Sequence, residues 1–546
     1  MAALFAIGVS PSVCAEPWNI YLPESSTNAK ALEPFLDALE SGRGAIVMGG
    51  DSNQLFNSFG WSDGVELAWT THFGAYATGL LAVAENSGSG SGAGYLYSSR
   101  FTTGSVFEAQ DAVEISAGVP HSSFLKPISF GVLAPGVSSS VPTFWGLQIP
   151  IETVEESPLF ALPSSHDLRA HLTFRAMAQD AGGRFHPTWE ASAIAGVDNV
   201  LGDPVDVVET PAGFDTVSLD LPYSDATGVL GSGFFRFRLN RNTITSDNVL
   251  GPLHMDFYQV ERVGAAGVSV STLAWLGGQG FKEFGEGFDE GREPFDTGDP
   301  GSPSAMSIYF SRLRSLMDEP RVLIRLYFGG NDIYSKQRSA AQSELDARAS
   351  INLIRTFWAQ QGWDESELYF LIVGWHHRPI DTSNGMWEHH ALIELRQRLA
   401  TIALQQPRTA YVDMRVLAPG EEMLDEGYWD GSIGGLTAHL SEEGYRVLAQ
   451  RELDTLLIRN DCVPDLNGDY HVDSQDLGLV LSSWGSADHS MDLTHDGVVN
   501  SQDLGRLLSE WGPCPLLDRP RFEQGGGLTP IPDRVRFFPH AEHKRD

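Results

Sequence analysis

The sequence predicts an α/β fold with a parallel sheet, interrupted by an all-β module and followed by a small helical unit. Three observations support this prediction. Short apolar runs that end in glycine alternate with helical stretches on both sides of a β-rich region. The β-rich region has short alternating runs separated by turn signals. Near the carboxyl terminus a sequence motif repeats with a spacing of 27 residues.

The α/β part is expected to consist of residues 16–75 and 256–458, and residues 76–255 are expected to form an inserted β module of the sandwich type. Strands alternating with helices predict helices on both faces of a parallel sheet. The expected strands of this sheet are 45–50, 322–328, 368–373 and 410–413, and the expected helices are 339–361 and 387–406. Typical runs of the β module are 171–176 and 234–239.

The 546-residue chain is acidic, with 36 basic and 71 acidic side chains and a net charge of −35. Such a surface repels phosphate groups, which argues against nucleic acids and anionic membranes as partners. Residues 1–15 combine an apolar stretch with the small-residue pattern Val13-Cys14-Ala15, which predicts a signal peptide and a secreted or periplasmic protein. No other apolar run is long enough to span a bilayer.

Ser52 follows the first expected strand in the run Gly49-Gly50-Asp51-Ser52. Its hydroxyl would lie at the carboxyl end of a parallel strand, where open α/β sheets bind ligands. Taken alone, Gly-Asp-Ser is more often a turn. A nucleophilic serine also needs a base and fixed hydrogen-bond donors for the oxyanion. The turn at 277–280, Asn331 after a strand and His439 before the last helix can supply them.

These blocks, in this order, resemble the SGNH/GDSL hydrolase family of esterases, lipases and carbohydrate deacetylases, which have a flavodoxin-like sheet. The resemblance implies that Ser52 is the nucleophile and His439 the general base. It also implies an oxyanion hole formed by the N–H of Ser52, the N–H of Gly278 and the amide of Asn331, with Gly277 as an alternative to Gly278. No cofactor is expected for catalysis.

The chain departs from that family at the residue that orients the histidine. The family usually has an aspartate three residues before the histidine, and Leu436 occupies this position. Asp430 could orient His439 from the same loop, and otherwise the enzyme would work with a Ser–His dyad. The long β insertion is a second departure.

The repeated motif aligns 465–484 with 492–511 and has the spacing of a calcium loop of the EF-hand kind. A direct duplication with aspartate at the last ligand position resembles a type I dockerin. The first loop has Tyr470 where the second has Gly497. The expected ligands are Asp465, Asn467, Asp469, the His471 carbonyl, Asp473 and Asp476 in the first loop, and Asp492, Thr494, Asp496, the Val498 carbonyl, Asn500 and Asp503 in the second.

The repeat unit at 461–514 has a net charge of −9, so its folding is expected to depend on calcium. Cys462 and Cys514 bracket the unit, which suggests a disulfide between its ends. The dockerin resemblance implies a cohesin module as a partner, bound through Ser474-Gln475 and Ser501-Gln502. Residues 515–546 are expected to be disordered.

The histidine pairs His376-His377 and His389-His390 have no surrounding frame of metal ligands, so a structural role is favoured, although His376 follows a strand end and could line the pocket. The leading interpretation is a secreted serine esterase that removes O-acetyl or similar acyl groups from a polysaccharide. Two alternatives stay open. One is a glycan O-acyltransferase on the same scaffold, and the other is a non-catalytic glycan-binding protein that uses the β insertion.

Overall fold

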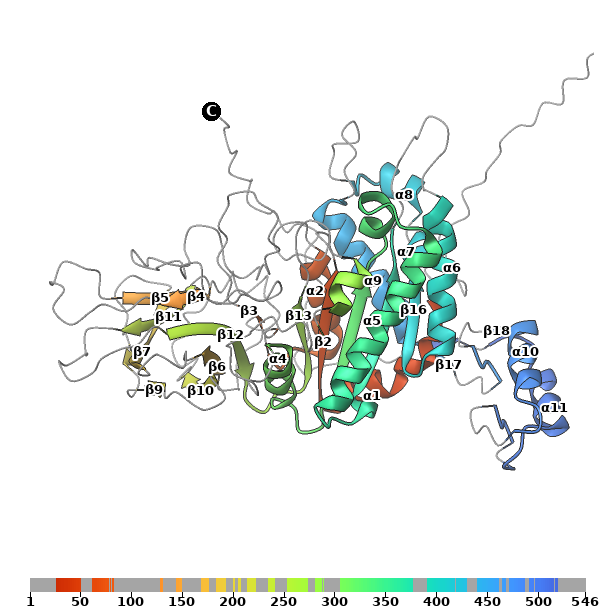
Figure 1. Cartoon of the computed structure of the whole chain (residues 1–546), viewed down its shortest axis with the longest axis horizontal. Coiled ribbons are helices and arrows are strands. Elements are labelled where there is room, and N and C mark those ends of the chain that lie inside the picture. The colour runs from red at the N-terminus through yellow and green to blue at the C-terminus, as the bar shows by residue number, and fades with distance from the viewer. Residues whose placement is uncertain are drawn as a thin grey trace, which may run out of the picture.

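The computed structural model (Figure 1) describes the α/β part, the β-strands of the insertion and most of the repeat unit. The described residues are 26–50, 61–77, 79, 81–82, 128–130, 144–149, 168–175, 183–192, 200–201, 205–207, 214–221, 234–240, 253–273, 280–286, 288, 305–376, 390–417, 419–429, 439–460, 464–467, 471–486, 491–494, 496–514 and 516–518. The expected signal peptide and most of the expected disordered tail lie outside these residues.

A six-stranded sheet in the order β1-β16-β15-β14-β2-β13 forms the centre of the molecule. All of its pairings are parallel except that of β1 with β16. The α/β class and the parallel sheet predicted from the sequence are therefore confirmed. The strands are β1 (Ser26–Thr27), β2 (Arg43–Gly50), β13 (Gly267–Thr272), β14 (Val322–Tyr327), β15 (Leu368–Gly374) and β16 (Thr409–Asp413).

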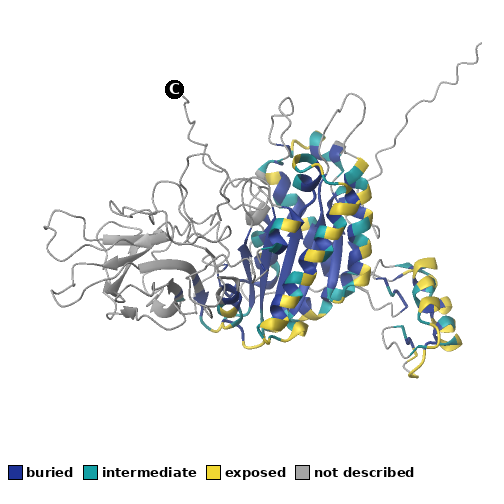
Figure 2. Cartoon of the chain, viewed as in Figure 1, coloured by how far each residue is buried: buried dark blue, intermediate teal, exposed yellow. Residues whose placement is uncertain are grey.

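Helices cover this sheet, and the sheet strands are almost wholly buried (Figure 2). Burial on both faces explains why the strand sequences are continuous apolar runs. The helical elements are η2 (Ala29–Leu32), α1 (Glu33–Ser41), α2 (Trp61–Phe73), α3 (Phe281–Glu286), α4 (Ala305–Arg314), η6 (Asn331–Ser335), α5 (Ala340–Gln360), η7 (Glu365–Glu367), α6 (His390–Gln405), α7 (Met414–Leu417), α8 (Gly420–Asp425) and α9 (Glu442–Leu457). No described helix has the length and apolarity needed to cross a membrane.

The insertion forms two antiparallel sheets, with β12 at its carboxyl end. Strand β12 spans the expected boundary at residue 255 and pairs with β6, whereas β13 joins the main sheet. The strands are β3 (Leu81–Ala82), β4 (Ile128–Phe130), β5 (Phe144–Ile149), β6 (Leu168–Arg175), β7 (Gly183–Ser192), β8 (Val200–Leu201), β9 (Val205–Val207), β10 (Phe214–Leu221), β11 (Phe234–Asn240) and β12 (Leu253–Arg262).

A buried charged network joins the insertion to the amino-terminal end of β2. The Glu261 carboxylate accepts hydrogen bonds from Arg43 Nη1 at 2.7 Å and from His171 Nε2 at 2.6 Å. Arg312 of α4 approaches His171 Nδ1 at 3.1 Å from the other side. The insertion is thus anchored at the edge of the sheet opposite to the carboxyl ends of the parallel strands.

A second buried ion pair joins the central strand β14 to α9. Arg325 and Glu452 are both fully buried, and the guanidinium donates from Nε and Nη2 to the two carboxylate oxygens at 2.7 and 2.5 Å. This two-point contact fixes both the position and the rotation of α9 against the sheet.

The repeat unit contains two short helices, each of which starts directly after an acidic loop. A capping box closes the first turn of each, with Asp473 and Asn500 as the N-cap residues. Its elements are β18 (His471–Val472), α10 (Ser474–Ser482), α11 (Ser501–Ser509) and β19 (Gly512–Pro513). Two strands that pair with each other flank it, β17 (Ile458–Asn460) and β20 (Leu516–Asp518). The expectation of disorder from residue 515 onward is therefore wrong for residues 516–518, which this pairing orders. The small core of the repeat unit includes Val472, Val480, Leu493, Val499 and Leu507.

Replacing Glu452 with Gln should leave the buried Arg325 charge without a counter-charge. We expect the free energy of unfolding, measured by urea denaturation, to fall by about 3–5 kcal/mol. Glu443→Gln, on the exposed side of the same helix, serves as the matched control and should have little effect. A Glu452→Gln protein as stable as the control would contradict this role of the pair.

The Glu261 network should make stability depend on acid pH. Burial alone would raise the pKa of this carboxyl, but hydrogen bonds from His171 and Arg43 outweigh it and lower the pKa from 4.5 to about 2. The stabilisation is therefore present above pH 4.5 and is lost as the pH falls toward 2. Thermal melts over this range should show a weaker pH dependence for Glu261→Gln than for the wild type, whereas Glu319→Gln, at an 85% exposed carboxylate, should behave like the wild type. Equal slopes for Glu261→Gln and the wild type would refute the assignment.

Candidate functional site

The register of the sheet brings the segments of the expected catalytic residues to one edge. Tyr327, the last residue of β14, lies opposite Gly50 of β2 and Val373 of β15. The chain therefore leaves β2 toward Ser52, and β14 toward Asn331, at the same carboxyl edge. Ser52 itself, together with Gly277, Gly278, Asp430 and Leu436, lies outside the described residues.

Two glycines shape the turn that presents Asn331. Gly329 has a φ of 121°, which side chains other than glycine rarely adopt. A methyl group on Gly330 would collide with the indole ring of Trp375, so the turn lies directly on that ring. Asn331 then begins η6, and its Oδ1 accepts a hydrogen bond from Ser335 Oγ at 3.1 Å.

A network of charged residues joins the Asn331 turn to the segment that begins at Gly280. Asp332 is buried and accepts a hydrogen bond from Arg338 at 2.8 Å, and Arg338 also binds Glu283 at 2.9 Å. Glu283 in turn accepts a hydrogen bond from the N–H of Gly280 at 3.0 Å. Burial raises the pKa of Asp332 despite the nearby Arg338 charge. The Asp332 carboxylate is thus held by Arg338, six residues further along the chain.

His439 is half-buried just before α9, in a loop whose two ends are closed by backbone contacts. Trp429 and Leu440 form an isolated antiparallel bridge. The N–H of Ser441 donates to the carbonyl of Tyr428 at 2.7 Å, and Ser441 Oγ accepts from the N–H of Gly444 at 3.2 Å at the start of α9. These contacts therefore hold the two ends of the His439 loop in place.

An aromatic cluster that the sequence analysis did not identify lies between these two parts of the site. His376 is 2% exposed, and Tyr327 OH bonds to its Nδ1. Trp375, Trp429 and Tyr445 surround the imidazole. The sequence signal for this cluster was the position of His376 directly after a strand. The side chains that contact it could not be predicted, because Tyr327, Trp429 and Tyr445 come from distant segments. Of the other paired histidines, His390 is exposed at the start of α6, and His377 and His389 lie outside the described residues.

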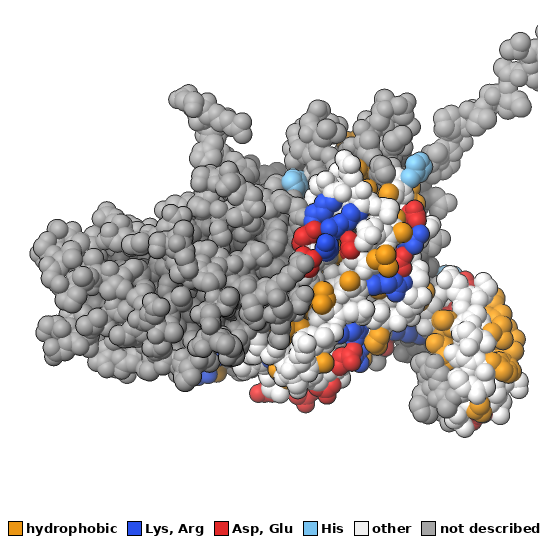
Figure 3. All heavy atoms as spheres, in the orientation of Figure 1, with side chains coloured by type: hydrophobic (Ala, Val, Ile, Leu, Met, Phe, Trp, Pro, Cys, Tyr) orange, Lys and Arg blue, Asp and Glu red, His pale blue; other side chains and the backbone are white. Residues whose placement is uncertain are grey.

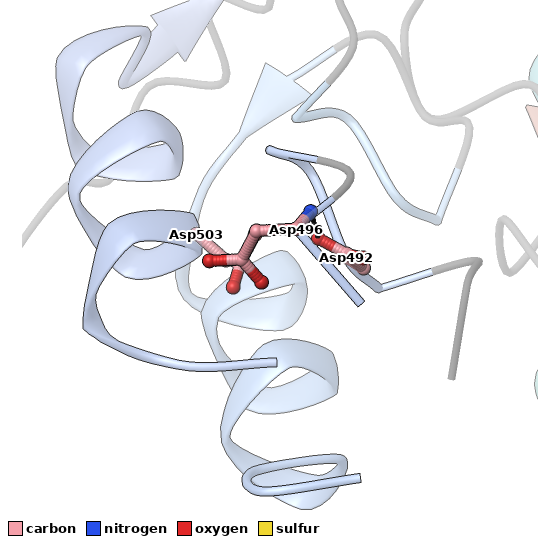
Figure 4. A group of neighbouring side chains, drawn as sticks. All are labelled: Asp492, Asp496 and Asp503. Atoms are coloured by element: carbon pink, nitrogen blue, oxygen red, sulfur yellow. Dashed lines mark hydrogen bonds between the residues drawn. The ribbon is translucent and has the colours of Figure 1, made fainter. Parts of the chain in front are cut away.

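The second acidic loop brings three aspartates together. Asp492, Asp496 and Asp503 each offer a carboxylate oxygen within 4.8 Å of the others, and Figure 4 shows the three side chains gathered in one place. Gly497 takes a φ of 92°, and its N–H donates to Asp492 at 2.7 Å. Hydrogen bonds from Asn500 and Thr494 outweigh burial and hold the pKa of Asp503 below its usual range. Such a set of oxygen atoms around a tight turn fits a calcium ion.

The remaining expected ligands of the second loop lie around the same turn. The side chain of Asn500 donates from Nδ2 to Asp496 at 2.9 Å and to the carbonyl of Val498 at 3.0 Å. Thr494 Oγ1 donates to Asp503 at 3.0 Å.

The first acidic loop has a different environment, because it contacts the α/β part. The carbonyls of Asp465 and Asn467 accept hydrogen bonds from Lys30 Nζ at 3.0 Å and from the N–H of Asn28 at 2.8 Å. The Lys30 ammonium also lies 3.9 Å from the Asp465 carboxylate. Asp476 is buried and accepts hydrogen bonds from the N–H groups of Leu466, Asn467 and Asp473.

Three further expectations for the repeat unit have different outcomes. Asp469 lies outside the described residues, whereas His471 is half-buried in β18 and pairs with Pro513. Cys514 is buried and disulfide-bonded. Cys462, its expected partner, lies outside the described residues, so the pairing itself stays a prediction.

No protein-family model matches this chain. No curated protein matches it either. Among solved structures, the chain aligns with a peptidoglycan O-acetylesterase at 14% identity over 79% of this chain and 96% of the other, with a TM-score of 0.42. It aligns with the salicylyl-acyltransferase SsfX3 of a tetracycline biosynthetic pathway at 11% identity over 60% and 95%, with a TM-score of 0.23. A family two carbohydrate esterase from Clostridium thermocellum aligns at 14% identity over 59% and 97%, with a TM-score of 0.21. The fold assignment above depends on the strand order and register of this chain, not on these alignments.

Proposed function

We propose that this protein is a serine esterase that removes acyl groups, with O-acetylated polysaccharide as its substrate class. The observation that carries the proposal is the register of Tyr327 with Gly50, because Gly50 lies two residues before Ser52 and Tyr327 lies four residues before Asn331. The anchoring of α9 through Arg325 and Glu452 supports it, because His439 lies just before that helix.

In the proposed mechanism, Ser52 Oγ attacks the ester carbonyl carbon while His439 accepts the hydroxyl proton. The N–H of Ser52, the N–H of Gly278 and the amide of Asn331 stabilise the oxyanion. When the intermediate collapses, the C–O bond to the sugar breaks and His439 returns the proton to the leaving alkoxide. Water then attacks the acyl carbon while His439 accepts its proton. The bond between the acyl carbon and Ser52 Oγ breaks, the carboxylic acid leaves, and His439 returns the proton to Ser52 Oγ. Asp430 is the proposed orienting acid for His439, in place of the leucine at 436.

Hydrolysis of p-nitrophenyl acetate and of acetylated xylan tests the mechanism. We expect Ser52→Ala to abolish turnover, and Asn331→Ala to lower kcat roughly 10²- to 10³-fold because one oxyanion donor is lost. Asn352→Ala, on the exposed face of α5, is the matched control and should retain wild-type activity. Full activity of Ser52→Ala would show that the serine is not the nucleophile. Acyl transfer to an added sugar in preference to water would instead favour an acyltransferase.

We also propose that the two acidic loops bind calcium. The second loop supports this most directly, because Asp492, Asp496 and Asp503 already converge on the turn at Gly497. Bound Ca²⁺ would offset the mutual repulsion of these carboxylates and would stabilise the folded unit by an amount that grows with the logarithm of the Ca²⁺ concentration divided by its Kd.

Chelation with EGTA should therefore lower the melting temperature of the repeat unit within the full chain, and excess Ca²⁺ should restore it. Asp503→Asn should reduce this response, whereas Asp318→Asn, at an exposed position of the α/β part, should leave it intact. Identical melting with EGTA and with Ca²⁺ would exclude a stabilising calcium site.

The two repeats expose the same residue types at matching positions, which supports a docking role. Leu481 and Leu508 are each 52% exposed, and Trp484 and Trp511 are 48% and 49% exposed. The buried position directly before each exposed leucine differs, with Val480 in one helix and Leu507 in the other. Figure 3 shows hydrophobic side chains gathered on the surface of this unit. The repeats are thus identical at these exposed positions, where the fold does not demand identity.

Gly478 and Gly505 strengthen this argument. Each is exposed in the middle of a helix, where glycine costs about 1 kcal/mol relative to alanine. A methyl group at either position would meet no atom within 4 Å. Packing within the chain therefore does not require glycine there, whereas close approach of a partner would. The dockerin resemblance makes a cohesin module the proposed partner.

Replacing both glycines with alanine should raise the stability of the unit and weaken its binding to a type I cohesin module, as measured by calorimetry with Ca²⁺ present. Ser311→Ala, on the exposed face of α4, is the control for binding. Unchanged cohesin affinity after both substitutions would argue against this face, and no measurable binding by the wild type would argue against this partner.

A further inference from the structure

We propose that His376 is a positioning residue for the esterase reaction, held by the hydroxyl of Tyr327. In this role it fixes the base of the His439 loop against the strand ends that lead to Ser52 and Asn331. The inference rests on the proposed function, but its structural part, the attachment of the loop, can be measured separately.

On the strand side, His376 is firmly placed. Its Nδ1 bonds to the hydroxyl of Tyr327, the last residue of β14. The preceding residue, Trp375, is held through its carbonyl by Nε of the buried Arg396 at 3.0 Å. The indole of Trp375 lies against Gly330, directly before Asn331. His376 is therefore part of the same rigid edge that presents the proposed oxyanion donor.

On the loop side, the same imidazole contacts both ends of the His439 loop. Its ring centroid lies 5.8 Å from that of Trp429, which forms the backbone bridge with Leu440. It lies 6.3 Å from the ring of Tyr445, in the first turn of α9, at an interplanar angle of 89°. His439 lies between these two contacts along the chain. A shift of the His376 ring would therefore move the two ends of the His439 loop relative to Asn331.

The position of His439 matters more in this chain because Leu436 stands where the family has its orienting aspartate. Without a carboxylate three residues away to orient it, His439 depends for its position on how its loop is attached to the sheet. A misplacement of about 1 Å can cost roughly 10²-fold in rate. The Tyr327–His376 contact supplies such an attachment.

Tyr327→Phe tests this, because it removes one hydroxyl and keeps the buried ring. We expect kcat on p-nitrophenyl acetate to fall about tenfold, with KM unchanged, because orientation of the base affects the transition state and not substrate binding. Hydrogen exchange of the backbone amides of residues 439–445 should become faster, while that of α5 stays unchanged. His376→Phe should have a larger effect of the same kind. Tyr369→Phe, at the opposite end of the neighbouring strand β15, is the matched control and should match the wild type in every measurement.

The outcomes separate the two levels of inference. If the wild type and Ser52→Ala are equally inactive, the proposed function fails, and the exchange rates of 439–445 still test the attachment of the loop. If the wild type is active, Ser52→Ala is inactive and Tyr327→Phe has wild-type kcat, the proposed function stands and the positioning role of His376 is overturned. Wild-type exchange rates of 439–445 in both Tyr327→Phe and His376→Phe would likewise overturn it.

Discussion

The buried pair of Arg325 and Glu452 is the constraint on which the arrangement of this α/β domain depends. Arg325 lies in the central strand and Glu452 in the last long helix of the domain, and neither side chain reaches solvent. A lone charge at this depth would be severely destabilising, so strand and helix are locked together in one register. The helix also packs closely on α2, where a methyl group on Gly64 would come within 3.1 Å of the backbone of Tyr445 and Arg446. One helix thus links the strand before Asn331, the helix after the Ser52 segment and the loop of His439.

Close contacts and a buried ion pair fix the turn at the carboxyl edge of the sheet. The turn before Asn331 depends on a positive φ at Gly329 and on contact between Gly330 and an indole ring. Asp332 is buried and charge-paired beneath it, at the expense of desolvation. Donors held in this way need no reorganisation when charge develops on a substrate, which is the physical basis of oxyanion stabilisation. In the proposed mechanism, the Asn331 amide would be a donor of this kind.

The two acidic loops share a sequence pattern but have different surroundings. The first contacts the α/β domain, because Asn28 and Lys30 bind its carbonyl groups. Asn28 has a φ of 57°, and its side chain donates to the carbonyls of Ala403 and Thr409, so it fixes the loop to both α6 and β16. The conformation of this loop is thus coupled to the domain that it follows. The second loop has the converging carboxylates and the glycine turn of a cation site.

The sequence by itself determined the fold class, the four strands β2, β14, β15 and β16, the helices α5 and α6, and the duplication of the acidic loops. It did not identify β1 and β13 as strands of the sheet. The features that it determined are local, because apolar runs, glycine turns and ligand spacing are properties of short segments. It also pointed to Ser52, Asn331 and His439 as a group, through their order along the chain. Only the tertiary structure decided that Gly50, Tyr327 and Val373 share a register, that Arg325 is paired with Glu452, and that Tyr327 binds His376. These contacts join segments far apart in the sequence, and no local pattern specifies which buried polar groups meet.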